Sequence, residues 1–152
     1  MGKRAKQVAA IPMRLDKKGR LRLLLVTSRG SKRWVPPKGW IMDGKKPWRA
    51  AEIEALEEAG VRGYIAKKKL GTYKYTKILD DGDELKCKVT LYPMVVEKVE
   101  KRWKERRERT RHWFSAKGAS KAVDEHDLAQ LLRKLHKSPK KVPIVKEILK
   151  QS

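Results

Sequence analysis

The chain has 152 residues, with 40 Lys and Arg against 18 Asp and Glu, and its formal net charge is +22. A hydrophobic fraction of 39% is high enough for a folded core, which excludes a disordered basic tail, and we expect one domain over residues 1–152. The single cysteine excludes an internal disulfide, and no apolar run approaches the length of a membrane span, so we expect a cytoplasmic protein.

The first third of the chain predicts a hairpin, a loop and a helix. Residues 7–14 and 21–28 are predicted strands, joined by a turn-like segment at 16–20. Two adjacent prolines within residues 34–39 force extended backbone and exclude a helix there. A helix is expected to follow this loop, because Pro47 suits a first helical turn.

The middle of the chain predicts a second hairpin. Two strands are expected over residues 64–78 and 85–98, around an acidic turn at 80–83. Cys87 alternates with polar residues in the second of these strands, so we interpret it as a small core residue and not as a nucleophile. The Trp113–Phe114 pair is expected to close the sheet.

Two helical segments are predicted at the C-terminal end, over residues 118–136, with a break near Asp124, and over 142–150. The chain contains no internal repeat and no low-complexity linker. Together the elements predict a mixed α/β domain, in which a mixed sheet is flanked by helices.

Three glutamates lie close together on the helix expected after Pro47. Glu54, Glu57 and Glu58 are spaced i, i+3 and i+4, so they share one helix face. Three carboxylates on one face repel each other unless a cation lies between them, and Mg²⁺ prefers such oxygen ligands. Taken alone, the same spacing also fits a solvated acidic helix face.

The residues around this helix resemble the Nudix box, G-x5-E-x7-R-E-U-x-E-E-x-G-U, where U is a bulky aliphatic residue. Gly39 matches the first glycine, Glu54 the first helix acid, Glu57 and Glu58 the acid pair, and Gly60 the exit, without a gap. The resemblance implies the Nudix αβα sandwich. It also implies hydrolysis of a phosphoanhydride with Mg²⁺, or Mn²⁺ as its substitute.

Three positions depart from the box. Lys45 stands where the family has glutamate, Ile53 where it has arginine, and Ala55 where it has a larger aliphatic residue. In the family this glutamate and arginine hold the loop against the helix. Both are absent here, and losing a whole ion pair can be milder than losing one partner. We interpret the segment as a Nudix helix with an altered brace.

Two basic segments outside the box resemble the diphosphoinositol polyphosphate phosphohydrolase branch of the family. One is residues 26–29 followed by 32–39, and the other is residues 108–115, where basic residues precede Trp113–Phe114. Arginine matches phosphate with a planar fork of donors. The resemblance implies that a polyanionic small molecule is the substrate and that its phosphates contact Ser28, Arg29, Lys38, Arg109, Arg111 and Lys6.

The resemblance also implies the roles of the acids. Glu54 and Glu58 would bind the metal together with the backbone carbonyl of Gly39, and Glu57 would be the general base. Some Nudix enzymes use an acid outside the box, and three unranked candidates are Glu97, Glu100 and Glu105.

Two other functions stay open. The charge would also suit an RNA 5′-pyrophosphohydrolase, and the departures at Lys45 and Ile53 would suit a non-catalytic polyanion or nucleic-acid binder on a Nudix scaffold. The intact acid trio argues against the non-catalytic binder. No RNA-binding module pattern is visible, so nucleic acid is not the favoured partner. The oligomeric state is left open.

Overall fold

Two long strands, β1 (Ala5–Leu15) and β7 (Glu84–Val99), run parallel to each other through the middle of the sheet. The computed structural model describes residues 4–151. Residues 1–3 and residue 152, the two ends of the predicted domain, lie outside the described residues. The sheet has the order β3-β2-β1-β7-β5, with β4 paired to β1, β6 to β7 and β8 to β2. These further strands are β2 (Leu21–Thr27), β3 (Trp34–Val35), β4 (Lys38–Trp40), β5 (Val61–Ile65), β6 (Gly71–Ile78) and β8 (Arg111–Ser115).

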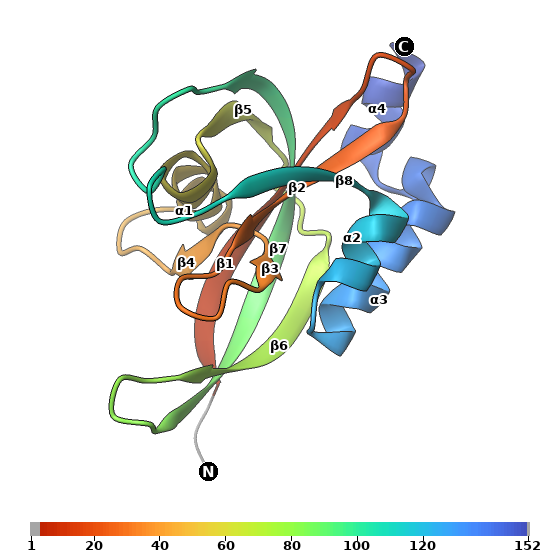
Figure 1. Ribbon diagram of the computed structural model, residues 1–152. Coiled ribbons are helices and arrows are strands. Elements are labelled where there is room, and N and C mark those ends of the chain that lie inside the picture. The colour runs from red at the N-terminus through yellow and green to blue at the C-terminus, as the bar shows by residue number, and fades with distance from the viewer. Residues whose placement is uncertain (1–3, 152) are drawn as a thin grey trace.

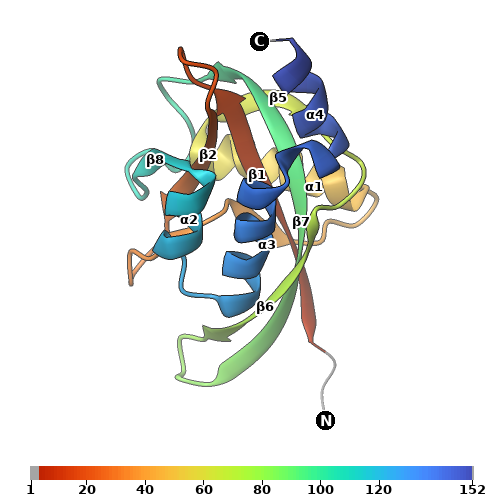
Figure 2. The same ribbon diagram turned by 90° about the vertical axis from the view of Figure 1, so that its right-hand side faces the viewer.

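Helices cover both faces of this sheet. Helix α1 lies on one face, whereas α2 and α3 lie on the other, as two perpendicular views show (Figures 1 and 2). A short 3-10 turn, Pro139–Lys141, joins α3 to α4. The helices are α1 (Pro47–Glu54), which a π-helical turn (Ala55–Ala59) continues, α2 (Ala116–Ala122), α3 (His126–Lys137) and α4 (Pro143–Lys150).

Strand β1 shows why two cores form. Successive side chains of a strand point to opposite faces. Ile11 and Met13 therefore pack into the core under α2, α3 and α4, whereas Val8 and Ala10 pack into the core under α1. Such near-continuous apolar sequence is typical of strands that are buried on both faces. The predicted sandwich of a mixed sheet between helices is confirmed.

The second hairpin was predicted correctly at its turn but wrongly in its first strand. The expected strand over residues 64–78 is divided into β5 and β6 by a loop at 66–70. The amides of Ala66 and Leu70 both donate to carbonyls of β7, at 2.9 and 2.7 Å, so the three lysines between them loop out of the sheet. Propensity alone does not show that both segments pair with the same edge of one long strand.

The remaining elements follow the prediction. Asp124 lies between α2 and α3, where the helix break was expected. Cys87 is fully buried on β7 and lies within the sheet. Among the described residues, no helix combines the length and the apolar character that a membrane span needs.

Candidate active site

The acidic helix begins and ends as its sequence requires. Pro47 lies in the first turn of α1, and the helix closes with the π-helical turn Ala55–Ala59, a feature that often accompanies functional sites. Gly60 then adopts a φ of 66°, the left-handed conformation that favours glycine at the end of a helix.

The three box glutamates do not have equal environments. Glu54 and Glu58 are buried, with 9% and 7% of their surface exposed. The side chain of Glu57 is one-third exposed, and its Oε2 lies 3.5 Å from the Lys104 Nζ. The predicted trio is therefore divided into two sheltered acids and one at the surface.

Gly39 lies directly against the carboxylate of Glu54. A Cβ atom added at Gly39 would lie 2.3 Å from the Glu54 Oε2, so no larger residue fits while this carboxylate keeps its place. Gly39 lines the same cavity as Glu54 and Glu58, and its backbone carbonyl is a further hard oxygen donor. Among residues 4–151, no three His, Cys, Asp or Glu side chains form a ready metal cluster. A set of two carboxylates and one backbone carbonyl remains, and such oxygen donors fit Mg²⁺ when water completes the coordination.

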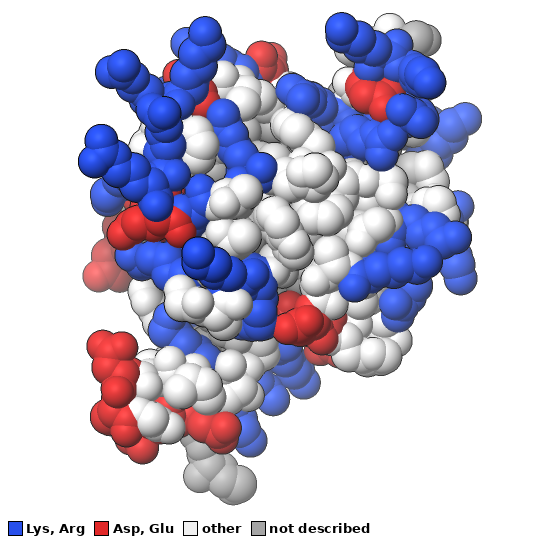
Figure 3. Space-filling view, in the orientation of Figure 1, with Lys and Arg blue, Asp and Glu red and all other residues white. Residues whose placement is uncertain are grey.

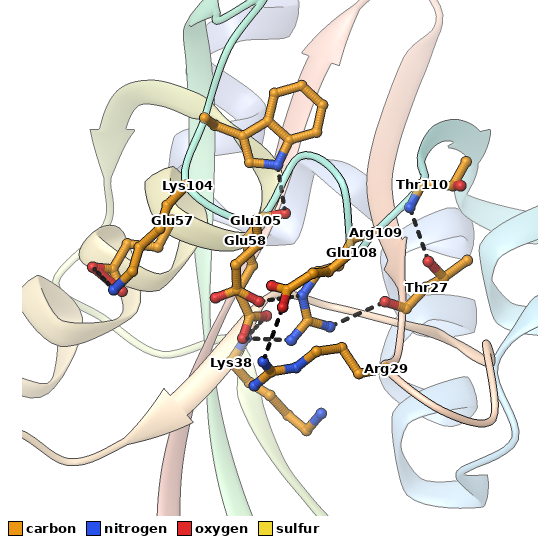
Figure 4. A network of polar contacts seen from close by, with 11 residues as sticks. Thr27, Arg29, Lys38, Glu57, Glu58, Lys104, Glu105, Glu108, Arg109 and Thr110 are labelled. Atoms are coloured by element: carbon orange, nitrogen blue, oxygen red, sulfur yellow. Dashed lines mark hydrogen bonds and ion pairs between the residues drawn. The ribbon is translucent and has the colours of Figure 1, made fainter.

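A network of donors holds Glu58 in place (Figure 4). Its Oε1 accepts from the backbone amide of Lys38 at 3.1 Å, and its Oε2 accepts from the Arg109 Nη2 at 3.1 Å. Arg109 also donates from Nε to the Glu105 Oε1 at 2.7 Å and from Nη1 to the Thr27 carbonyl at 3.0 Å. One guanidinium therefore joins the helix acid, a loop acid and the end of β2.

Burial and crowding alter the protonation of this site. Burial, together with the neighbouring carboxylates of Glu58, Glu57 and Glu105, raises the pKa of Glu54 to about 7. Burial also raises the pKa of Glu58, although the Arg109 guanidinium acts in the opposite direction. Clustered carboxylates that resist ionisation without a cation are typical of a site built to receive one.

This raised pKa predicts how stability depends on pH. From pH 4.5 to about 7, folded Glu54 keeps a proton that the unfolded chain has released, so stability should fall as pH rises through this range. In chelator, the Tm of wild type is therefore expected to fall relative to that of Glu54→Gln as pH rises from 5 to 7. Glu52→Gln, on the other side of the same helix, is the control and should not change the slope. Parallel Tm curves for wild type and Glu54→Gln would contradict the prediction.

The acids open into a cavity of about 870 Å³, a size typical of ligand sites. Four of the six predicted phosphate-binding residues line it: Ser28, Arg29, Lys38 and Arg109. The Lys38 ammonium lies 5.1 Å from the Tyr75 ring centroid, and burial lowers its pKa. Cationic and acidic side chains thus face one space, which suits a phosphate ligand bound together with a metal.

Lys6 and Arg111, the other two predicted phosphate contacts, are not brought to this cavity. Lys6 is exposed on β1. The Arg111 guanidinium donates to the carbonyls of Ala59 and Glu100, at 2.9 and 2.7 Å, and stacks on the Trp103 ring. Sequence reasoning recognised its charge but could not identify its partners.

The structure ranks the three acids outside the box. Glu105 lines the cavity, and its side chain is 13% exposed. Glu100 is hydrogen-bonded by Arg62, which lowers its pKa, and Glu97 is exposed on β7. Glu105 is therefore the acid that joins the box glutamates. Residues 101–110 form no helix, so the four-residue spacing of Glu105 and Arg109 was not a signal from which their ion pair could be predicted.

The sheet between helices and the box helix define a Nudix domain, and comparison with known proteins agrees. The model of the NUDIX domain matches residues 4–135, and the chain belongs to this family. The chain is 32% identical over 108 residues to Nudix hydrolase 12, mitochondrial, from Arabidopsis thaliana, a match that covers 69% of this chain and 53% of the relative. It thus spans about half the length of that relative.

Further relatives support the branch and the fold. Diphosphoinositol polyphosphate phosphohydrolase 3-beta from Bos taurus is 28% identical over 134 residues, which cover 86% of this chain and 77% of the relative. A C. elegans Ap4A hydrolase binary complex superposes with a TM-score of 0.64 at 24% identity, covering 86% of this chain and 94% of that one. A NUDIX hydrolase from Nitrosomonas europaea gives a TM-score of 0.67 at 19% identity, with 90% of both chains covered. At these identities, the two structural matches concern the fold.

Proposed function

We propose that this chain is a Mg²⁺-dependent hydrolase of phosphoanhydride bonds in a polyphosphorylated small molecule, a diphosphoinositol polyphosphate or a dinucleoside polyphosphate. The observation that carries the proposal is the cavity that buried Glu54 and Glu58 share with Lys38 and Arg109. The relative named diphosphoinositol polyphosphate phosphohydrolase 3-beta supports the substrate class.

Each part of the site has a role in this reaction. Glu54, Glu58 and the Gly39 carbonyl would hold Mg²⁺, or Mn²⁺ as its substitute. When bound, the metal would neutralise phosphate oxygens and lower the pKa of water. The carboxylate of Glu57 accepts the proton of the attacking water. Arg29 lines the cavity, with its guanidinium 3.6 Å from Glu108, and holds the phosphate chain by charge and hydrogen bonds.

The charge distribution supports a compact substrate over an RNA chain. Lys and Arg cover several parts of the surface, but acidic side chains gather at the tip of the β6–β7 hairpin (Figure 3). Residues 74–78 of this hairpin line the cavity, and the exposed acids follow directly at Asp80, Asp81, Asp83 and Glu84. A polyanion extending past this tip would meet like charge, whereas a short polyphosphate would stay within the cavity.

A turnover assay across substrates tests the proposal. With Mg²⁺, we expect hydrolysis of inositol pyrophosphates or diadenosine polyphosphates at rates well above those for nucleoside triphosphates and triphosphorylated RNA. Full activity in excess chelator would overturn the metal-dependent mechanism. Efficient cleavage of RNA, with affinity falling steeply with salt, would favour the RNA 5′-pyrophosphohydrolase.

The two sheltered acids should control the need for metal. Glu54→Gln and Glu58→Gln are each expected to raise the Mg²⁺ concentration required for half-maximal activity, because an amide is a poorer ligand than a carboxylate for a hard cation. Mg²⁺ titration of initial rates measures this effect. Glu52→Gln, with its side chain directed away from these acids, is the control. Unchanged Mg²⁺ dependence in both variants would remove these residues from the metal site.

Trp40 should distinguish the two candidate substrates. It lines the cavity beside Gly39 and is 46% exposed, so its indole offers a surface on which a base can stack. Trp40→Ala is expected to raise KM for diadenosine tetraphosphate about tenfold, the value of one lost stacking contact, and to leave KM for an inositol pyrophosphate nearly unchanged. Ile41→Ala is the control, because Ile41 is 45% exposed but does not line the cavity. Equal changes for both substrates would contradict a stacking role.

A further inference from the structure

The loop between β7 and β8 provides partners for the whole C-terminal end of the box helix. The last carbonyls of a helix have no partners within the helix itself. Here the carbonyls of residues 57, 58, 59 and 60 all accept hydrogen bonds from residues 100–111. In that order, the donors are Glu105 N at 3.1 Å, Trp103 Nε1 at 3.1 Å, Arg111 Nη1 at 2.9 Å and Glu100 N at 2.7 Å.

Two side chains complete this attachment by packing on Gly60. The Arg111 guanidinium carbon lies 3.8 Å from the Trp103 ring centroid, within the range of a cation–π contact. A Cβ at Gly60 would lie 2.7 Å from the Trp103 ring and 2.8 Å from the Arg111 Nη1. The box glycine is thus required by its φ of 66° and by the two side chains that cover it. A cation at this helix end is also favourable toward the helix dipole.

The attachment determines where the loop presents its functional side chains. Because the Glu105 amide is bonded to the Glu57 carbonyl, the Glu105 carboxylate reaches the cavity. Arg109, four residues later, pairs with Glu105 at 2.7 Å and with Glu58 at 3.1 Å. Release of the loop would therefore displace an acid and a cation from the site together.

We infer that Trp103 and Arg111 are positioning residues that hold the 100–111 loop on the box helix and thereby place Glu105 in the active site. The kinetic part of this inference rests on the proposed hydrolase function, whereas the structural part does not.

Limited trypsin digestion of the metal-free protein tests whether the loop is attached to the box helix, and this test needs no enzymatic activity. The loop carries exposed cleavage sites at Lys101, Arg102, Lys104, Arg106 and Arg107. Trp103→Phe keeps an aromatic ring but removes the N–H donor, so loop cleavage should become about three- to tenfold faster, as expected for one lost hydrogen bond. Arg111→Met removes the donors to the carbonyls of Ala59, Gly60 and Glu100 and should accelerate cleavage by more than about tenfold.

Matched controls separate loop release from general loosening. Trp48→Phe makes the same change near the start of α1, and Arg107→Met removes an exposed guanidinium from the same loop. Both controls should be cleaved at the wild-type rate at the sites that they keep. If trypsin cleaves both Trp103→Phe and Arg111→Met at the wild-type rate, the inference is overturned. Trp103→Phe is the milder variant and serves if Arg111→Met does not fold.

A double-mutant cycle with Glu105 tests the route to the active site. If Trp103 acts by placing Glu105, Trp103→Phe should lower kcat about threefold or more in the wild-type background and less than about twofold in Glu105→Gln. KM should change little in both backgrounds. Equal falls in kcat in the two backgrounds would show a structural role that does not pass through Glu105. If the wild-type protein hydrolyses no substrate, the proposed function fails. The rates of trypsin cleavage still test whether Trp103 and Arg111 hold the loop on the box helix.

Discussion

Replacing Glu57 with glutamine is expected to lower kcat by about 10²–10⁴-fold, because the amide keeps the shape of the side chain but cannot accept a proton. KM should change little, because glutamine keeps the size of the side chain and Glu57 is not one of the predicted phosphate contacts. Steady-state kinetics with saturating Mg²⁺ on the preferred substrate measure the effect. Lys104→Met is the control, because it removes the cation beside Glu57 and keeps the base.

Glu105 is the rival base that the structure introduces. Unlike Glu57, it faces the cavity, and its carboxylate lies close enough to Glu54 to raise the pKa of that residue. Glu105→Gln should lower kcat by less than Glu57→Gln does if Glu57 is the base. If Glu57→Gln keeps wild-type turnover and Glu105→Gln loses about 10²-fold or more, the general base is Glu105 and not Glu57.

The fold could be predicted wherever a pattern repeats along the chain. The i, i+3, i+4 spacing of the box acids placed them on one helix, and the strands expected over residues 7–14 and 21–28 form as β1 and β2. Gly39 and Gly60 were recognised from the box. Only the structure gives their physical reasons, which are the contact with the Glu54 carboxylate and the packing of Trp103.

The candidate site could not be completed from sequence, because its remaining residues come from a loop without periodicity. Seven basic residues among residues 101–111 indicated phosphate binding as one group. In the structure they divide: Arg111 caps the helix, Arg109 joins two acids, and Arg107 is exposed at the surface. The charge of each side chain can be read from the sequence, whereas the partner of that side chain depends on how the loop lies against the helix. The same reason kept Glu105 unranked.

The largest effect on stability is expected at Arg109. Its side chain is 8% exposed, and it pairs with Glu58 at 3.1 Å and with Glu105 at 2.7 Å. Arg109→Ala would leave two sheltered carboxylates without their common cation. Removing one partner of a buried ion pair costs about 3–5 kcal/mol, so the free energy of unfolding in chelator should fall by about this amount. Urea denaturation of the metal-free protein measures it.

Arg29 provides the matched comparison, because it is also an arginine of the cavity but is exposed. Its side chain is 62% exposed and lies 3.6 Å from Glu108, and surface pairs of this kind contribute little to stability. Arg29→Ala should therefore change the free energy of unfolding by less than about 0.5 kcal/mol while raising KM for the polyphosphate substrate. Arg109→Ala should raise KM and also destabilise the protein, and Mg²⁺ should restore part of its stability by neutralising Glu58. Equal unfolding midpoints for the two variants would contradict the network in which Arg109 holds the acids. If KM rises only in Arg29→Ala, Arg109 pairs with Glu58 and Glu105 but does not contact the substrate phosphates.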